Sequence, residues 1–238
     1  MFRSLKRYTQ VFCLVIISIF NVAHAEQNLL QQGLNAYHSK DYQTAWSTLY
    51  PLAQKGQMEA QRLIGVMYRH GLGINKNDDE AIKWYRKAAQ QGHVRAQNSL
   101  EVMYRFGLGI KKNSAEAARW LGAAAGQGYA KSQENLGLLY LDGDGIEQSD
   151  QLAAKWLTAA ASQGQSKSQL TLGLLTLSGR GIVQDHTQGI EWIRRAALQG
   201  SQRATLALAK VYEEGLYGIE KDSVQAKIWY AKAGVVYH

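Results

Sequence analysis

The chain has 238 residues, a formal net charge of +8 at pH 7 and a single cysteine. One cysteine cannot form an internal disulfide or build a cysteine-ligated zinc site, so neither can stabilise the fold. The basic residues form no long consecutive block, which disfavours nucleic acid as the partner and leaves an acidic protein, an acidic glycan or an anionic membrane surface.

The first 25 residues have the three parts of a secretory signal peptide. Three cations lie within residues 3–7, an apolar stretch follows at 11–20, and the sequence Ala-His-Ala at 23–25 has the small-x-small pattern of a cleavage site. The apolar stretch is about half as long as a membrane-spanning helix requires. We therefore expect cleavage after Ala25, a periplasmic or secreted mature protein, and no membrane span after cleavage.

Removal of this segment changes both the charge and the thiol content. It takes away three cations and Cys13, which leaves 24 basic and 19 acidic residues, a net charge of +5, and no thiol. A mature chain without cysteine excludes thiolate nucleophiles as well as disulfides. Its stability must therefore come from packing.

Residues 26–56 are expected to form a helical hairpin that caps the amino-terminal end. Gly33, Tyr37 and Ala45 repeat part of a pattern found farther along the chain, but the central glycine pair of that pattern is missing. Pro51, the only proline, falls where the second helix of the hairpin would run. Because proline lacks the backbone N–H and clashes with the preceding turn, we expect a kink or an early end of the helix there.

The rest of the chain repeats itself with a period of 36 residues. Five copies are predicted, at 57–92, 93–128, 129–164, 165–200 and 201–237. A glycine marks the boundaries of the copies: Gly56, Gly92, Gly128, Gly164 and Gly200. A tryptophan recurs at the same step, with one extra residue before the last: Trp84, Trp120, Trp156, Trp192 and Trp229. A fixed period of this length predicts an architecture in which each unit packs on its neighbours.

Each copy is predicted to contain two helices joined by a tight turn. Apolar residues recur at three- and four-residue steps on both sides of a Gly-x-Gly pair, which in the first copy is Gly71 to Gly73. Residues that can accept a hydrogen bond from a free backbone N–H stand where each second helix should begin: Asn77, Asn113, Ser149, Asp185 and Asp222. The predicted fold class is all-α, an α/α superhelical solenoid of tandem 36-residue helix-turn-helix repeats, with the tryptophans in its core.

The order Ala-x3-Leu-Gly-x2-Tyr, Gly-x-Gly, Ala-x2-Trp and Ala-Ala-x2-Gly, which covers residues 57–237, resembles the Sel1-like repeat family. That resemblance implies an α/α superhelix related to tetratricopeptide arrays. It also implies an adaptor that binds other proteins in the bacterial envelope, in signalling, or in contact with host or competitor proteins. The main departures are Glu101 and Ala209, which replace the first-helix glycine in the second and fifth copies.

No residue pattern for catalysis, a cofactor or a metal is present in the sequence. No two of the six histidines have a zinc-ligand spacing on one helix, and the turn from Asp142 to Asp144 lacks the remaining ligands of a calcium loop. The Gly-x-Gly pairs lack the preceding strand of a phosphate-binding loop, and no serine lies in a nucleophile elbow. We expect no catalytic, cofactor or metal site, and a protein that is not an enzyme.

By analogy with tetratricopeptide arrays, the first helix of each copy forms the inward wall. Four cations occupy the second position of this helix in consecutive copies, and we name them the cation row: Arg95, Lys131, Lys167 and Arg203. The positive end of the helix dipole lies there, so local helix stability does not explain them. Four further residues would line the same wall: Arg62, Arg69, Arg105 and Phe106. A solvated charged face is the alternative explanation.

These patterns predict a non-catalytic protein–protein interaction adaptor whose concave groove binds an acidic segment of a partner protein. Within the same class, an immunity or inhibitor protein that masks a toxin is a second possibility. A hydrolase of cell-wall material or of β-lactams is the alternative from another class. The β-lactam activity is linked to a cysteine-rich branch of the family, whose cysteines the mature chain lacks.

Overall fold

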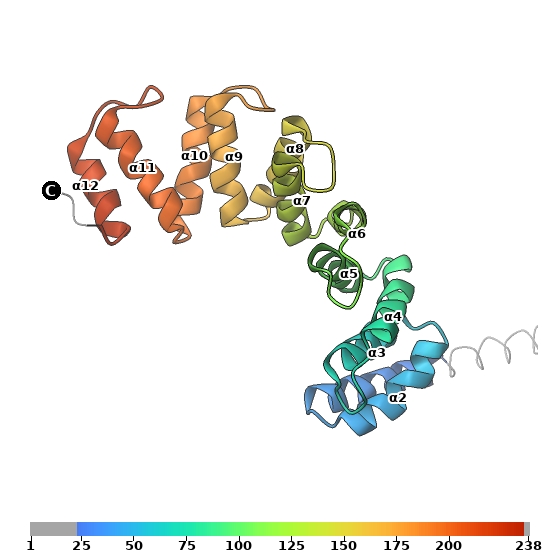
Figure 1. Ribbon diagram of the computed structural model, residues 1–238. Coiled ribbons are helices and arrows are strands. Elements are labelled where there is room, and N and C mark those ends of the chain that lie inside the picture. The colour runs from blue at the N-terminus through green and yellow to red at the C-terminus, as the bar shows by residue number, and fades with distance from the viewer. Residues whose placement is uncertain (1–22, 236–238) are drawn as a thin grey trace, which may run out of the picture. The chain divides into compact units, whose positions relative to one another are not determined.

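The computed structural model describes residues 23–235, and within them the regular structure consists of helices alone. An opening helix, described over residues 23–38, precedes the eleven that are labelled in Figure 1. Their bounds are α2 Tyr42–Gln54, α3 Met58–His70, α4 Asp78–Gln90, α5 Val94–Phe106, α6 Ser114–Gly126, α7 Ala130–Asp142, α8 Asp150–Ser162, α9 Ser166–Ser178, α10 His186–Leu198, α11 Gln202–Glu214 and α12 Ser223–Lys232. The predicted all-α class is confirmed.

The predicted signal segment, residues 1–25, lies outside the described residues except for its last three. Among residues 23–235, none of the helices combines the length and the apolar character that crossing a membrane requires.

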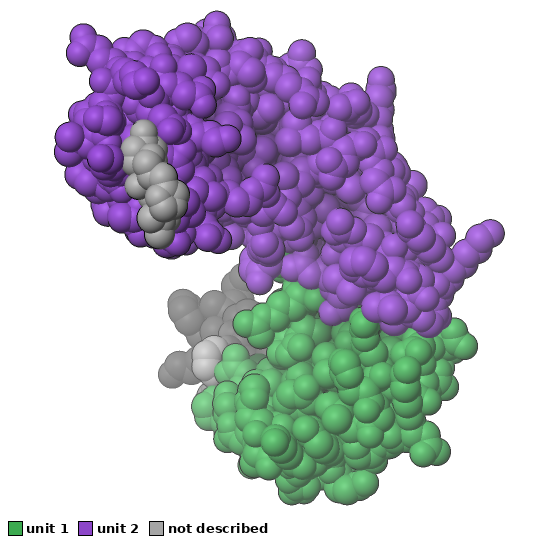
Figure 2. Space-filling model, turned by 60° about the vertical axis from the view of Figure 1, so that its left-hand side comes forward, with its two compact units in different colours: residues 1–96 green, residues 97–238 purple. Residues whose placement is uncertain are grey.

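Contacts between residues divide the chain into two compact units, residues 1–96 and 97–238 (Figure 2). The division falls inside α5, so it coincides with none of the predicted repeat boundaries. In the first unit α2 packs on α3 and α3 on α4. In the second unit each helix from α6 to α12 packs on the next one along the chain. Packing between sequence neighbours is what a repeat architecture requires.

Side-chain caps confirm where the sequence predicts the second helices to begin. In each of them a backbone N–H of the first turn donates to the side chain of the capping residue: Asn77, Asn113, Ser149, Asp185 and Asp222. Asp41 caps α2 in the same way. Local hydrogen bonding therefore fixes these helix starts.

The Gly-x-Gly turns need glycine for two separate reasons. The first glycine ends the first helix in the left-handed conformation, as Gly143 does with a φ of 72°. The second glycine also has a positive φ, and at Gly73, Gly145 and Gly181 it lies against the start of the preceding second helix. A Cβ on Gly145 would be 2.3 Å from the Cβ of Ser114, and one on Gly181 would be 2.2 Å from the Asp150 carbonyl oxygen. A side chain would force these segments apart, so the turns at Gly145 and Gly181 hold their repeats against the ones before.

Of the two outcomes expected at Pro51, a kink or an early end of the helix, the early end is wrong. α2 continues three residues beyond the proline, to Gln54. Proline removes one backbone hydrogen bond, but Leu49, Leu52 and Ala53 of the same helix are buried, whereas the Pro51 ring is exposed. Burial of these neighbours outweighs the loss of one hydrogen bond.

A buried glutamine in the first helix joins consecutive repeats, and the sequence pattern alone does not predict its burial. Gln133 donates from Nε2 to the Ala125 carbonyl of the preceding second helix (3.3 Å) and accepts from Gln163, which follows its own second helix (2.7 Å). The same pair of hydrogen bonds recurs at Gln61 and Gln169. Because each amide is buried and satisfied on both sides, it fixes the spacing between one repeat and the next.

The last helix differs from the others. α12 has ten residues, whereas each of the other labelled helices has 13. Thr205 stands at the first-helix position where the preceding copies have the buried glutamine. Lys227 is exposed at the position where α4 and α10 bury Ile82 and Ile190. An exposed charged residue thus replaces a buried isoleucine at this position of α12.

Candidate protein-binding surface

In the second unit the first helices of the repeats lie beside one another at their amino-terminal ends. Ser132 Oγ on α7 donates to Asn98 Oδ1 on α5 (2.8 Å), and Ser168 Oγ on α9 donates to Glu134 Oε2 on α7 (3.1 Å). Farther along, α9 and α11 contribute to one buried hydrophobic cluster. These contacts join α5, α7, α9 and α11 into a wall. The second positions of α7, α9 and α11 are exposed on it.

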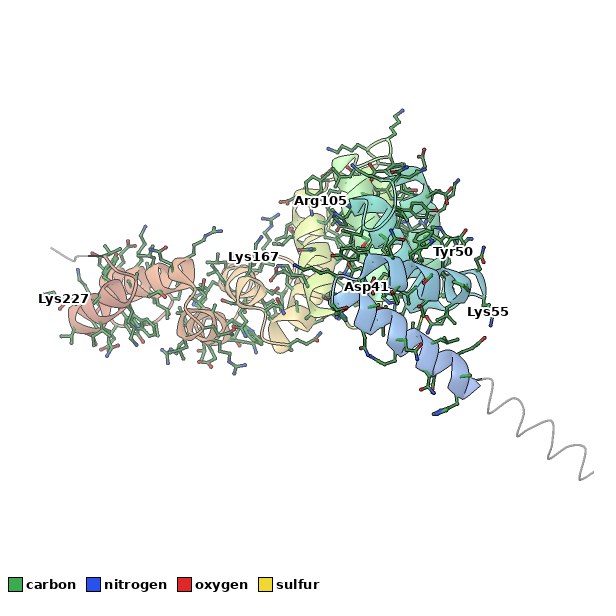
Figure 3. The ribbon with its side chains drawn as sticks, turned by 90° about the horizontal axis from the view of Figure 1, so that it is seen from below. Asp41, Tyr50, Lys55, Arg105, Lys167 and Lys227 are labelled. Atoms are coloured by element: carbon green, nitrogen blue, oxygen red, sulfur yellow. The ribbon has the colours of Figure 1, made fainter. Side chains whose placement is uncertain are left out.

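The eight residues predicted to bind a partner are divided between the two units. Arg62, Arg69 and Arg95 lie in the first. The second unit holds the other five: Arg105, Phe106, Lys131, Lys167 and Arg203. Two of these, Arg105 on α5 and Lys167 on α9, are labelled in Figure 3. A single groove formed by all eight residues therefore stays a prediction.

Arg62 is engaged in an internal ion pair. Its guanidinium donates to both oxygens of the Glu59 carboxylate, at 2.5 and 3.0 Å, and His93 Nε2 lies 2.5 Å from one of the same oxygens. Burial alone would raise the pKa of Glu59, but the hydrogen bonds from His93 and Arg62 outweigh burial and lower this pKa to about 2. The charge of Arg62 is largely compensated within the first unit, which leaves little of it for an acidic partner.

We expect the Glu59 ion pair to make stability depend on pH in acid. The folded pKa of about 2 lies below the ordinary value of 4.5, so the carboxylate stabilises the fold above about pH 5 and loses that contribution as the pH falls toward 2. In urea unfolding, Glu59→Gln should be less stable than wild type by about 1–2 kcal/mol near neutral pH, a figure reduced for the partial exposure of the pair. The two proteins should converge in strong acid.

Glu147→Gln, at an exposed carboxylate in a loop, is the matched control and should follow the wild-type curve. A stability difference for Glu59→Gln that stays constant from neutral pH to strong acid would contradict the ion-pair assignment.

Arg105 and Phe106 lie on the exposed surface where α5 ends. Phe106 is 63% exposed, and the Arg105 guanidinium lies 5.5 Å from its ring centroid. Arg105 also donates to the Glu101 carboxylate at 3.4 Å. Burial raises the pKa of Glu101 by more than the nearby Arg105 lowers it. Glu101 occupies the position at which Gly137 and Gly173 pack against a second helix in other copies. Because Glu101 is buried, part of the charge of Arg105 compensates its carboxylate.

The cation row is not uniform. Lys131 Nζ forms an ion pair with Glu134, whose side chain is 2% exposed and also accepts a hydrogen bond from Ser168. Lys167 and Arg203, in contrast, are exposed and form no ion pair within residues 23–235. The structure therefore distinguishes one cation that is neutralised by a buried acid from two whose charge faces solvent.

No cluster of three or more histidine, cysteine, aspartate or glutamate side chains that could hold a metal ion occurs in the part of the chain that the structure describes.

Comparison with known proteins identifies the repeat. The family model described as Sel1 repeat matches residues 59–93, 95–129, 130–165, 166–201 and 202–234. A Sel1 repeat protein from Oxalobacter formigenes is similar in structure, with a TM-score of 0.79 and 34% identity over 86% of this chain and 84% of that one. A protective antigen present in uropathogenic Escherichia coli strains is also similar, with a TM-score of 0.79 and 29% identity over 91% of this chain and 48% of that one. No curated protein matches the chain. The predicted family resemblance and repeat architecture are confirmed.

Proposed function

The chain belongs to the Sel1-repeat family, and on that premise we propose that it is a non-catalytic adaptor of the bacterial envelope that binds an acidic segment of a partner protein. Sel1-repeat proteins typically take part in protein–protein interaction. The envelope location rests on the signal-peptide pattern of residues 1–25. The acidic partner rests on the charge of the wall formed by the first helices.

One observation supports the acidic partner most directly. Lys167 and Arg203 occupy the same position of consecutive first helices, are both exposed, and enter no ion pair within the described residues. Their positive charge lies in the first turn, where the helix dipole disfavours it, so the local helix gains nothing from it. Two such cations one repeat apart can each form a charge-assisted hydrogen bond with a carboxylate of an elongated partner segment.

Charge reversal at these two positions tests the proposal. The variant Lys167→Glu/Arg203→Glu should lose capture of the native partner in affinity purification from the envelope followed by mass spectrometry, and capture by wild type should weaken as salt rises. The matched control is Lys111→Glu/Lys112→Glu, which makes the same charge change in an exposed loop. Melting temperatures of both variants should stay close to wild type, because exposed substitutions change stability by about 0.5 kcal/mol or less.

Equal capture by the reversed variant and wild type would contradict the acidic-partner proposal. A toxin among the captured proteins would assign the adaptor to the immunity class. Turnover of labelled peptidoglycan by the pure protein would contradict a non-catalytic role.

A further inference from the structure

We propose that the partner segment carries a large apolar side chain between its carboxylates, and that this side chain docks on α9 and α11. The inference rests on the proposed function, because it concerns the same wall. It adds that the partner segment must carry an apolar side chain as well as carboxylates. The surface concerned, which we name the rimmed patch, consists of three leucines and three cations: Leu170, Leu174, Leu206, Lys167, Arg203 and Lys210.

Helical spacing places these residues in two rows, one on α9 and one on α11. On α9, Lys167, Leu170 and Leu174 are separated by three and four residues and therefore share one face of the helix. On α11, Arg203, Leu206 and Lys210 have the same spacing. The two helices are joined below the patch by a buried cluster that includes Leu170 together with Ala204 and Leu208 of α11. The cluster also contains Ile190, Ile193, Ala196 and Ala197 of α10, so both rows stand on one buried core.

The apolar part of the patch is open to solvent mainly at Leu174. Leu170 is buried and Leu206 is partly buried, whereas Leu174 is 46% exposed. At the position of Leu174 the preceding first helices have Val66, Val102 and Leu138, which are less exposed. The exposed leucine therefore distinguishes α9 from the equivalent helices.

The cations at the edge of the patch have no compensating acid in either row. Lys167, Arg203 and Lys210 are exposed and form no ion pair within residues 23–235. On α7 the equivalent of Leu170 is Glu134, which neutralises Lys131, so that helix lacks both the unpaired cation and one of the two leucines. The combination is confined to the last two copies.

An apolar centre with a charged rim is the usual anatomy of a protein-binding surface, and the sign of the rim selects the partner. Carboxylates alone would satisfy the cations but leave Leu174 and the accessible part of Leu206 in water. An apolar side chain alone would bury the leucines but remove water from cations that gain no partner, which is costly. A protein segment with an apolar side chain flanked by aspartate or glutamate satisfies both requirements.

Three short fluorescein-labelled peptides test the inference by fluorescence anisotropy with the full chain. The first has a central leucine flanked by glutamates, the second replaces that leucine by serine, and the third keeps the leucine but replaces the glutamates by glutamine. The first should bind about tenfold more tightly than the second, the gain expected when a leucine side chain is largely buried. It should also bind more tightly than the third, and that advantage should shrink as salt rises.

Variants of the chain assign the contribution of each part. Leu174→Ser should abolish the preference for leucine over serine and leave the weaker binding of the acidic peptides, whereas Lys167→Glu/Arg203→Glu should abolish both. Leu198→Ser removes another exposed leucine of the second unit and is the control, which should behave as wild type. Because Leu174 is already half exposed, circular dichroism and melting of its variant should match those of wild type.

The outcomes separate this inference from the proposed function. Equal binding of the leucine and serine peptides would overturn the inference and leave an acidic partner in place. Failure of both acidic peptides, together with unchanged partner capture by the reversed variant, would overturn both. Binding of phosphatidylglycerol vesicles that depends on Leu174, without binding of any peptide, would show that the patch contacts lipid and would also overturn the inference.

Discussion

Replacement of Trp120 by alanine should lower the free energy of unfolding by about 3–5 kcal/mol, the range for truncation of a large buried aromatic side chain. The Trp120 side chain on α6 is 5% exposed, and the Arg119 guanidinium lies 4.3 Å from the centroid of its ring. The substitution removes the buried area of the ring and leaves a cavity that the surrounding residues cannot close completely. Urea unfolding followed by circular dichroism measures the effect.

Two further variants make this prediction specific. Trp156 occupies the same position one repeat later but is only partly buried, so Trp156→Ala should cost less than Trp120→Ala. Trp120→Phe keeps most of the apolar volume and removes an Nε1 donor that has no hydrogen-bond partner among the described residues, so it should retain most of the stability. Equal losses for the three variants would show that burial of the ring does not determine the effect.

The parts of the fold that depend on local chemistry could be predicted from the sequence. Asn77 and its equivalents mark helix starts because their side chains bond to N–H groups only two or three residues away. Gly143 and its equivalents mark helix ends because left-handed backbone favours glycine. Neither assignment requires knowledge of how one repeat packs on another. Because the pattern repeats every 36 residues, the same helix starts and ends could be predicted in each copy.

The contacts that join repeats could not be predicted in the same way. Gln61, Gln133 and Gln169 also recur at the period of the repeat, but an isolated glutamine on a helix is usually exposed. Its burial becomes apparent only when the preceding helix supplies the Ala125 carbonyl, or its equivalent, as an acceptor. Pro51 shows the opposite error, because a local rule predicted a helix end that the burial of neighbouring residues prevents.

The sequence predicted the position of the cations on the candidate surface, but not which of them form ion pairs. The repeat pattern identifies Lys131, Lys167 and Arg203 as equivalent. Whether each cation is neutralised by an ion pair, however, depends on the residue three places later. That residue is Glu134 in α7 and leucine in α9 and α11. Oppositely charged residues at this spacing are a known signal of helical ion pairs, and applied to α7 it would have separated Lys131 from the other two.

Because Lys131, unlike Lys167, pairs with a buried acid, Lys131→Met and Lys167→Met should differ in their effect on the free energy of unfolding. Lys131→Met should lower the free energy of unfolding by about 1–3 kcal/mol, because it leaves the carboxylate of Glu134 buried with a hydrogen bond from Ser168 but without its cation. The loss stays below that of a fully buried pair because the Lys131 side chain is 60% exposed and water can replace part of it. Lys167→Met should change stability by about 0.5 kcal/mol or less.

The double variant Lys131→Met/Glu134→Leu decides whether the ion pair is the cause. Replacing both members of a buried pair by apolar residues is often neutral or stabilising, and leucine already occupies this position in α9 and α11. The double variant should therefore recover the stability that Lys131→Met loses. In partner capture the order should be reversed, since Lys131→Met should bind as wild type does and Lys167→Met should bind less. If Lys131→Met retained full stability but lost the partner, Lys131 would be a binding residue like Lys167, and the division of the cation row would be wrong.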